Sequence, residues 1–164
     1  MAKTRKKNNL SRKSIIGLLR THSAIIEELR KRKVVRTRNN PVQGYAEWLV
    51  SKKLNLILEP NSNTGFDATD RKGTRYEIKG RRITPSNKST QLSAIRNLDK
   101  KHFDCLIGVI FDKDYNILYA AQIPHKVISE YSTYKAHTNA NIFHLRKSVL
   151  EDKRVKDITK KLTS

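Results

Sequence analysis

Two acidic residues and a lysine stand close together in the stretch "GFDATDRKGTRYEIKGRR", residues 65–82, and their types suit metal-assisted hydrolysis. Asp67 precedes Glu77, and Lys79 follows Glu77 by two positions. Carboxylates are ligands of Mg²⁺, which takes one or two of them together with phosphate oxygens of a substrate. A lysine beside such a site can place or help deprotonate a water molecule, or neutralise charge on a phosphate. The stretch therefore suggests a phosphodiesterase site, with a solvated charged hairpin as the alternative.

The turn between the two acidic residues decides whether they can meet. A three-residue loop at 71–73, with its glycine in the left-handed conformation, is a common hairpin connection. This register places Asp67 opposite Glu77, with Lys79 on the same face and Ile78 on the other. A two-residue loop would shift the register by one and scatter the three side chains. Because opposed carboxylates repel each other, the three-residue loop predicts a bound Mg²⁺, for which Mn²⁺ can substitute.

A helix upstream of the hairpin adds a fourth candidate residue. The pattern "NNPVQGYAEWLVSKKLNL" predicts a helix capped by Asn39 or Asn40, with Pro41 in its first turn. Glu47 falls on the border of its apolar face. A glutamate at this border can reach over the edge of the sheet, or it can simply be solvated.

Further elements must position these residues. The "LILEP" segment predicts a short strand before the hairpin, and "QLSAIRNLD" at 91–99 suggests a short helix after it. The apolar run at 102–112 is typical of a central strand, and 117–123 is most simply its antiparallel partner. Another helix is expected from 124. Together these elements predict an α/β fold, a mixed sheet flanked by helices.

The composition points to a polyanion as partner. The chain has 164 residues with 35 Lys and Arg against 15 Asp and Glu, a net charge of +20 and a pI near 10.3. Nucleic acid is the leading candidate, although a basic protein that only coats nucleic acid has the same composition. The single cysteine excludes an internal disulfide, and no apolar run approaches the ~20 residues of a membrane span. We expect a cytoplasmic protein without membrane contact.

The charge and hydropathy patterns divide the chain into four parts. We expect a basic disordered tail at 1–13, an amphipathic helix or arm at 14–38, a catalytic core at 39–150 and a basic tail at 151–164. The apolar face of the second part suits packing onto its own domain, or contact with a second copy or another partner.

On Glu47, Asp67 in "GFD", and Glu77 and Lys79 in "EIK", the chain resembles the PD-(D/E)XK nuclease superfamily from about Gly44 to Ser132. The resemblance implies a restriction-endonuclease-like core in the order α-β-β-β-α-β. It also implies Mg²⁺-dependent hydrolysis of phosphodiester bonds, with the three carboxylates holding metal and the lysine placing the attacking water. A phenylalanine stands where the superfamily name has proline.

These expectations converge on a Mg²⁺-dependent DNA endonuclease of the type II restriction kind, acting as a homodimer on double-stranded or branched DNA. A Holliday-junction resolvase or a DNA-repair nuclease of the same fold is the alternative within this class. A non-catalytic nucleic-acid-binding protein is the alternative outside it. The expected contacts to nucleic acid are Arg36, Arg38, Arg81, Arg82, Lys88 and Gln91.

Overall fold

The computed structural model describes residues 10–60 and 65–164. Most of the expected N-terminal tail lies outside these residues, and its last part forms a short 3₁₀-helix, η1 (Leu10–Arg12). None of the helices in the two described ranges is long and apolar enough to cross a membrane.

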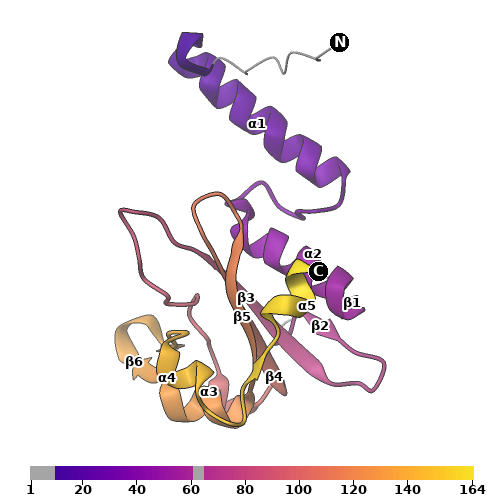
Figure 1. Cartoon of the computed structure of the whole chain (residues 1–164), viewed down its shortest axis with the longest axis vertical. Coiled ribbons are helices and arrows are strands. Elements are labelled where there is room, and N and C mark those ends of the chain that lie inside the picture. Colours follow the sequence, from indigo (N-terminus) through magenta and orange to yellow (C-terminus); the bar gives the residue numbers. More distant parts are fainter. Residues whose placement is uncertain (1–9, 61–64) are drawn as a thin grey trace.

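A six-stranded mixed sheet forms the centre of the molecule (Figure 1). Its strands, in spatial order, are β1 (Ile57–Leu58), β2 (Ala68–Thr69), β3 (Arg75–Arg82), β4 (Cys105–Phe111), β5 (Ile117–Pro124) and β8 (Lys156–Asp157). Strands β3 and β4 run parallel, and every other neighbouring pair is antiparallel. The predicted α/β fold with a mixed sheet flanked by helices is confirmed, as is the pairing of the central strand with its antiparallel partner.

The hairpin of β2 and β3 has the predicted register. Ala68 pairs with Tyr76 and Thr69 with Arg75. In the loop, Gly73 has a φ of 82° and donates its N–H to the carbonyl of Asp70 at 3.0 Å. A positive φ costs glycine little because it has no Cβ, so the three-residue loop sets the register that the sequence predicts.

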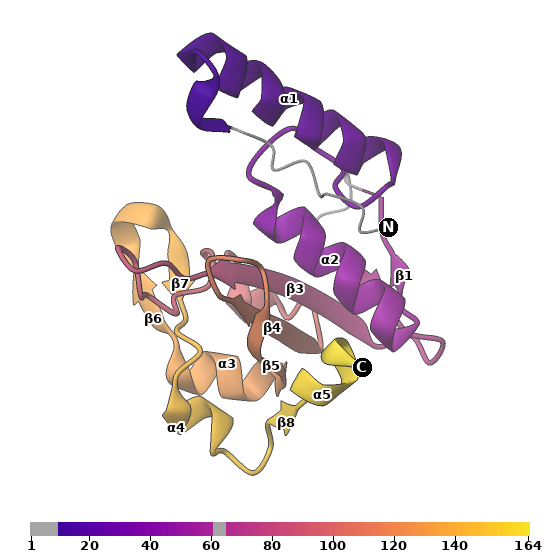
Figure 2. The ribbon, with the colours of Figure 1, turned by 45° about the horizontal axis from the view of Figure 1, so that its top comes forward.

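Helices cover both faces of the sheet. On one face, α2 (Pro41–Leu54) lies along β3 (Figure 2), and α5 (Thr159–Thr163) packs beside it through Ile158 and Leu162. The side chain of Asn40 accepts the N–H of Val42, as expected for the cap of a helix that opens with proline. The other face carries α3 (His125–Tyr131), α4 (Lys147–Leu150) and the small hairpin of β6 (Thr133–Lys135) and β7 (Ala140–Ile142).

The predicted helix at 91–99 is wrong. This segment is extended, and only η2 (Leu98–Lys100) at its end is helical. The N–H of Leu92 donates to the carbonyl of Phe143, and that of Ile95 to the carbonyl of Asn141, each at 3.0 Å. These bonds to a distant segment replace the i to i−4 bonds of a helix. The α-β-β-β-α-β order implied by the resemblance is therefore not reproduced between β3 and β4.

The segment 151–164, predicted as a basic tail, is partly folded onto the sheet. Part of this segment pairs with β5 as β8, and α5 follows it. Ile158 and Leu162 are buried in the cluster under α2, so two apolar residues among many charges suffice to dock the segment.

The predicted N-terminal helix is present as α1 (Ile15–Lys31), and residues 33–39 form a non-helical link to α2. Helix α1 stands off the rest of the molecule in Figures 1 and 2, and Ile26 is its one buried residue.

Candidate active site

Asp67 lies where β2 begins and contacts β3 through both its backbone and its side chain. Its N–H donates to the carbonyl of Tyr76 at 2.8 Å, and its carboxylate accepts the N–H of Ile78 at 2.7 Å. The residue is thus held against the strand that carries Glu77 and Lys79, as the register predicts.

Glu77 and Lys79 form an ion pair on the face of β3 that points away from α2. The Lys79 ammonium lies 2.5 Å from Glu77 Oε1, and the two side chains are 15% and 16% exposed. Ile78, between them, is fully buried in the cluster under α2. The alternation along the strand therefore places the lysine and the glutamate together, and the isoleucine in the core.

The charge of Asp67 is disfavoured where it lies. Burial, and then the charges of Glu77 and Glu47, raise its pKa to about 7, against the hydrogen bond from Ile78 and the charge of Lys79. Two carboxylates that destabilise each other in a partly buried place are an arrangement that a cation relieves.

Lys79 keeps its proton. Burial by itself lowers its pKa, but contact with Glu77 and the charges of Asp67 and Glu47 outweigh burial, so the pKa is raised above its ordinary value. An ammonium group can donate hydrogen bonds and neutralise negative charge, whereas it cannot accept a proton from water. Of the roles considered for this lysine, placing a water molecule and neutralising charge fit this state.

Glu47, on α2, lies close enough for its charge to act on Asp67 and Lys79, but both of its carboxylate oxygens have other partners. The side chain forms an ion pair with Arg36, and Gln43 donates to Glu47 Oε1 at 3.0 Å. Only 8% of the residue is exposed. Arg36 also donates to the carbonyl of Glu59 at 2.7 Å, so the link before α2 and the end of β1 enclose this glutamate.

Gln43 joins α2 to β3 beside the candidate residues. Its side-chain amide donates to the carbonyl of Ile78 at 2.6 Å and accepts the N–H of Gly80 at 3.1 Å. A Cβ on Gly80 would lie 2.7 Å from the Cβ of Ala46, so this glycine permits the close approach of helix and strand. Only its position one turn before Glu47 could have pointed to Gln43 in the sequence.

A hollow of about 780 Å³ opens beside Glu77 and Lys79. Its opposite wall comes from the segment 93–103 and carries three basic side chains that were not predicted: Arg96, Lys100 and His102. Gly65 has a φ of 121°, and a Cβ there would lie 2.8 Å from that of His102, so the segment before Asp67 lies directly against this wall. The basic residues were visible in the sequence, but the helix predicted at 91–99 gave no reason to direct them at the site.

The predicted contacts to nucleic acid are dispersed. Lys88 is exposed in the loop after β3, and Gln91 forms an isolated bridge with His144. Arg36 is engaged with Glu47, and Arg38 with Glu27 at 2.5 Å. The structure does not bring this set together.

The two arginines that end β3 have internal contacts. Arg81 donates to the carbonyl of Ser89 at 3.1 Å and to Asn87 at 3.2 Å, and so holds the loop that follows the strand. Arg82, on the opposite face, lies 4.9 Å above the ring of Tyr115. Both arginines therefore have structural partners.

Within residues 10–60 and 65–164, no three Asp, Glu, His or Cys side chains converge tightly enough to enclose a metal ion. The expected ligand set of Asp67, Glu77 and Glu47 is therefore not assembled as a cage, and the oxygens of Glu47 are bonded to Arg36 and Gln43 instead. Asp67 and Glu77 still fit Mg²⁺, because this ion needs only one or two protein carboxylates and keeps its other positions for water and phosphate.

No protein-family model matches the chain, and no curated protein matches it either. The resemblance to the PD-(D/E)XK superfamily rests on Glu47, Asp67, Glu77 and Lys79 alone and stays a prediction.

Proposed function

We propose that the protein is a Mg²⁺-dependent nuclease of the PD-(D/E)XK kind that hydrolyses phosphodiester bonds in DNA. One observation carries the proposal: burial and Glu77 destabilise the charged form of Asp67, and the ion pair of Glu77 with a protonated Lys79 lines a hollow whose opposite wall is basic. A polyanionic substrate agrees with the net charge of +20.

Asp67 and Glu77 would hold the metal. When bound, Mg²⁺ polarises a phosphoryl oxygen and makes a coordinated water more acidic. With Glu77 holding the metal, the Lys79 ammonium would be free to donate to the attacking water or to a phosphate oxygen. Arg96 and Lys100 bind the phosphates on either side of the scissile bond.

Glu47 acts on this site from a distance. With its oxygens bonded to Arg36 and Gln43, it contributes negative charge near Asp67 and Lys79, and it becomes a metal ligand only if Arg36 moves away. Its first role is therefore to strengthen the site's preference for a cation.

Duplex DNA cleaved by a restriction-type homodimer is the first choice of substrate, since one site cuts one strand and two chains supply two sites. A four-way junction cut by a resolvase of the same kind is the second. The described residues favour neither, so both DNA forms belong in one experiment.

A non-catalytic nucleic-acid-binding role is the alternative, and one specific observation favours it. Glu77 and Glu47 are each already paired with a cationic side chain of the same chain, so ion pairs alone neutralise two of the three carboxylates. Under this alternative the hairpin is structural, and only the basic hollow contacts nucleic acid.

Two substrates distinguish these possibilities: supercoiled plasmid and a synthetic four-way junction. Each is incubated with the protein in Mg²⁺ or in EDTA. The nuclease proposal expects cleavage in Mg²⁺ only. Preference for plasmid supports the restriction reading, and preference for the junction supports the resolvase reading. Binding of both forms without cleavage in Mg²⁺ or Mn²⁺ supports the non-catalytic alternative.

A further inference from the structure

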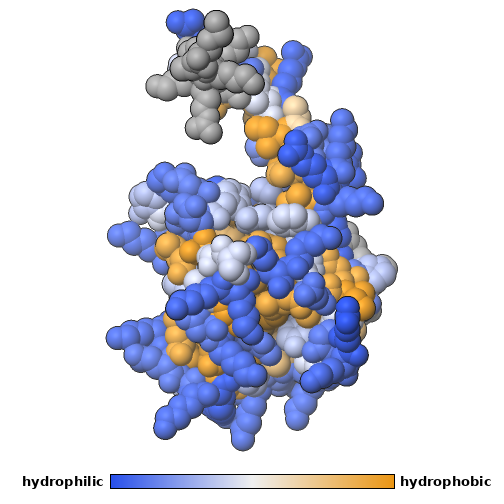
Figure 3. Space-filling model, turned by 45° about the vertical axis from the view of Figure 1, so that its right-hand side comes forward, coloured by the Kyte–Doolittle hydropathy of each residue, from blue (hydrophilic) through white to orange (hydrophobic). Residues whose placement is uncertain are grey.

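Helix α1 exposes large apolar side chains that residues 10–60 and 65–164 leave uncovered. Ile15 is 81% exposed, Leu19 58% and Ile25 55%. The orange surface along the upper helix in Figure 3 shows this apolar stripe. A helix of this length gains most of its stability from packing an apolar face, and here only Ile26 is buried. We therefore expect a partner to bind this apolar stripe.

The apolar stripe of α1 is nearly symmetric about His22. At 100° per residue, Ile16 lies about 120° from the direction of His22, and the other six large apolar residues of α1 fall within about 60° of it. They also lie at equal distances before and after it, so that Ile15 corresponds to Leu29, Leu18 to Ile26, and Leu19 to Ile25. A twofold antiparallel pair requires a surface that complements itself in this way.

A hollow of about 720 Å³ lies between the C-terminal half of α1 and the body of the protein. Its lining combines polar and charged residues with apolar and aromatic ones, among the latter Ile25, Leu29, Val35, Tyr45 and Tyr115. In an antiparallel pair, the N-terminal half of the second α1 lies against this half of the first and fills the hollow. A parallel pair would instead bring the C-terminal half of the second helix, with the body attached to it, to the same hollow.

The size of the surface favours the same arrangement. Helix α1 is about 26 Å long and about 10 Å across, so a seam along the helix alone falls well short of the ~800 Å² that each partner buries in a typical stable complex. The hollow supplies additional apolar surface for the N-terminal half of an antiparallel partner helix.

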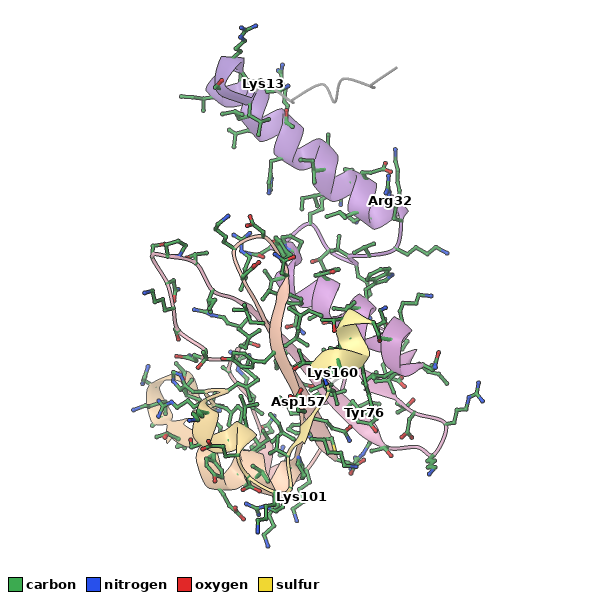
Figure 4. All side chains as sticks on the ribbon, in the orientation of Figure 1. Lys13, Arg32, Tyr76, Lys101, Asp157 and Lys160 are labelled. Carbon is green, nitrogen blue, oxygen red and sulfur yellow. The ribbon has the colours of Figure 1, made fainter. Side chains whose placement is uncertain are left out.

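The charges are compatible with this pairing. Figure 4 labels Lys13 and Arg32 at the two ends of the helix, and both of its acidic residues, Glu27 and Glu28, lie in the C-terminal half. Antiparallel pairing places them across from the partner's segment between Lys13 and Arg20. Glu27 already pairs with Arg30 and Arg38, and Glu28 with Arg32, so the partner's cations would join existing ion pairs.

We infer that α1 is a self-association surface, on which a second copy of this chain packs its own α1 antiparallel about a twofold axis at His22. This gives the expected homodimer a specific interface, and it does not rest on the nuclease proposal because oligomeric state is measured without substrate.

Sedimentation of the full chain tests the surface. We expect a dimer at tens of micromolar protein, and a dissociation constant at least about tenfold higher for Leu19→Glu. The matched control is Ala24→Glu, on the opposite side of the helix, which should sediment as wild type. Both positions are exposed in the monomer, so neither change should unfold it. A monomeric wild type, or equal weakening by both variants, overturns the inference.

Disulfide trapping in a Cys105→Ser background tests the geometry. His22→Cys should crosslink readily, because the two copies meet at the axis. Ile15→Cys alone should not, since its two copies would be about 21 Å apart along the helices, but it should crosslink when mixed with Leu29→Cys. Crosslinking of Ile15→Cys to itself, with none for His22→Cys, contradicts the antiparallel arrangement.

Discussion

The carboxylate of Asp67 accepts a hydrogen bond from the main-chain N–H of Ile78 at 2.7 Å. This bond ties the start of β2 to the strand that carries the other two candidate residues. It also holds a carboxylate where burial and the charge of Glu77 disfavour ionisation. In an ordinary solvated hairpin neither burial nor a neighbouring carboxylate would disfavour the charge of Asp67. The effects of pH and of Mg²⁺ on stability follow from this difference.

Asp67 should make the metal-free protein less stable as the pH rises. Its pKa is about 7 in the folded chain and near 3.8 when the chain is unfolded. Between these values the folded state binds more protons, so stability falls as the pH rises toward 7 and stays low above it. The loss is at most about 4 kcal/mol, at 1.36 kcal/mol per pKa unit.

Urea unfolding in EDTA at pH 5.5 and pH 8 measures this effect. Asp67→Asn keeps an acceptor for the Ile78 N–H and removes the titration, so at pH 8 it should be more stable than wild type. Equal pH dependence of the two proteins would show that the raised pKa is not real.

Mg²⁺ should stabilise the wild-type protein against heat at pH 8. An ion that binds only the folded state adds about 2.7 kcal/mol at a hundred times its dissociation constant. The rise in Tm should be lost in Asp67→Asn and reduced in Glu77→Gln. Asp114→Asn, in the exposed turn between β4 and β5, removes a carboxylate away from the site and should keep the full rise. An equal rise in all four proteins would mean that the ion binds elsewhere.

Gln43→Ala should destabilise the protein by about 2 kcal/mol, because it removes bonds to Glu47, Ile78 and Gly80 that are each worth about 0.5–1.5 kcal/mol. Lys52→Ala, exposed on the same helix, should change stability little. The measurement is chemical denaturation. A Gln43→Ala protein as stable as wild type would mean that the amide does not hold α2 to β3.

Arg96 and Lys100 should contribute to DNA affinity through phosphate contacts. Each alanine substitution should weaken binding similarly on unrelated sequences and lower the salt dependence of log K by about one unit. Lys160→Ala, exposed on α5 on the other side of the sheet, should not change the slope. Fluorescence anisotropy over a range of salt concentrations measures it, and unchanged slopes for all three variants would place the DNA elsewhere.

Local signals predicted much of this fold, and long-range contacts account for what they missed. The glycine of a three-residue turn fixed the register of Asp67 against β3, and Asn40 with Pro41 fixed the start of α2, because neighbouring residues determine both. Leu92, Ile95 and Leu98 recur every third residue, a spacing that also fits one face of a helix. The segment is extended instead, because its backbone bonds to residues some fifty positions later.

The partners of Glu47 could not be predicted from the sequence for the same reason. Its position on α2 followed from helical periodicity, but its ion pair with Arg36 depends on the path of a link without regular structure. The acidic residues could thus be named from the sequence, while the basic wall opposite them could not.

Plasmid cleavage by Lys79→Ala in Mg²⁺ tests the central claim most directly. A protonated Lys79 that donates to water or phosphate in the transition state predicts a single-turnover rate at least about 100-fold below wild type. DNA binding should persist, and Lys72→Ala, in the exposed turn of the same hairpin, should cleave at the wild-type rate. Cleavage by Lys79→Ala at the wild-type rate, or no cleavage by the wild-type protein with any divalent metal, would contradict the account.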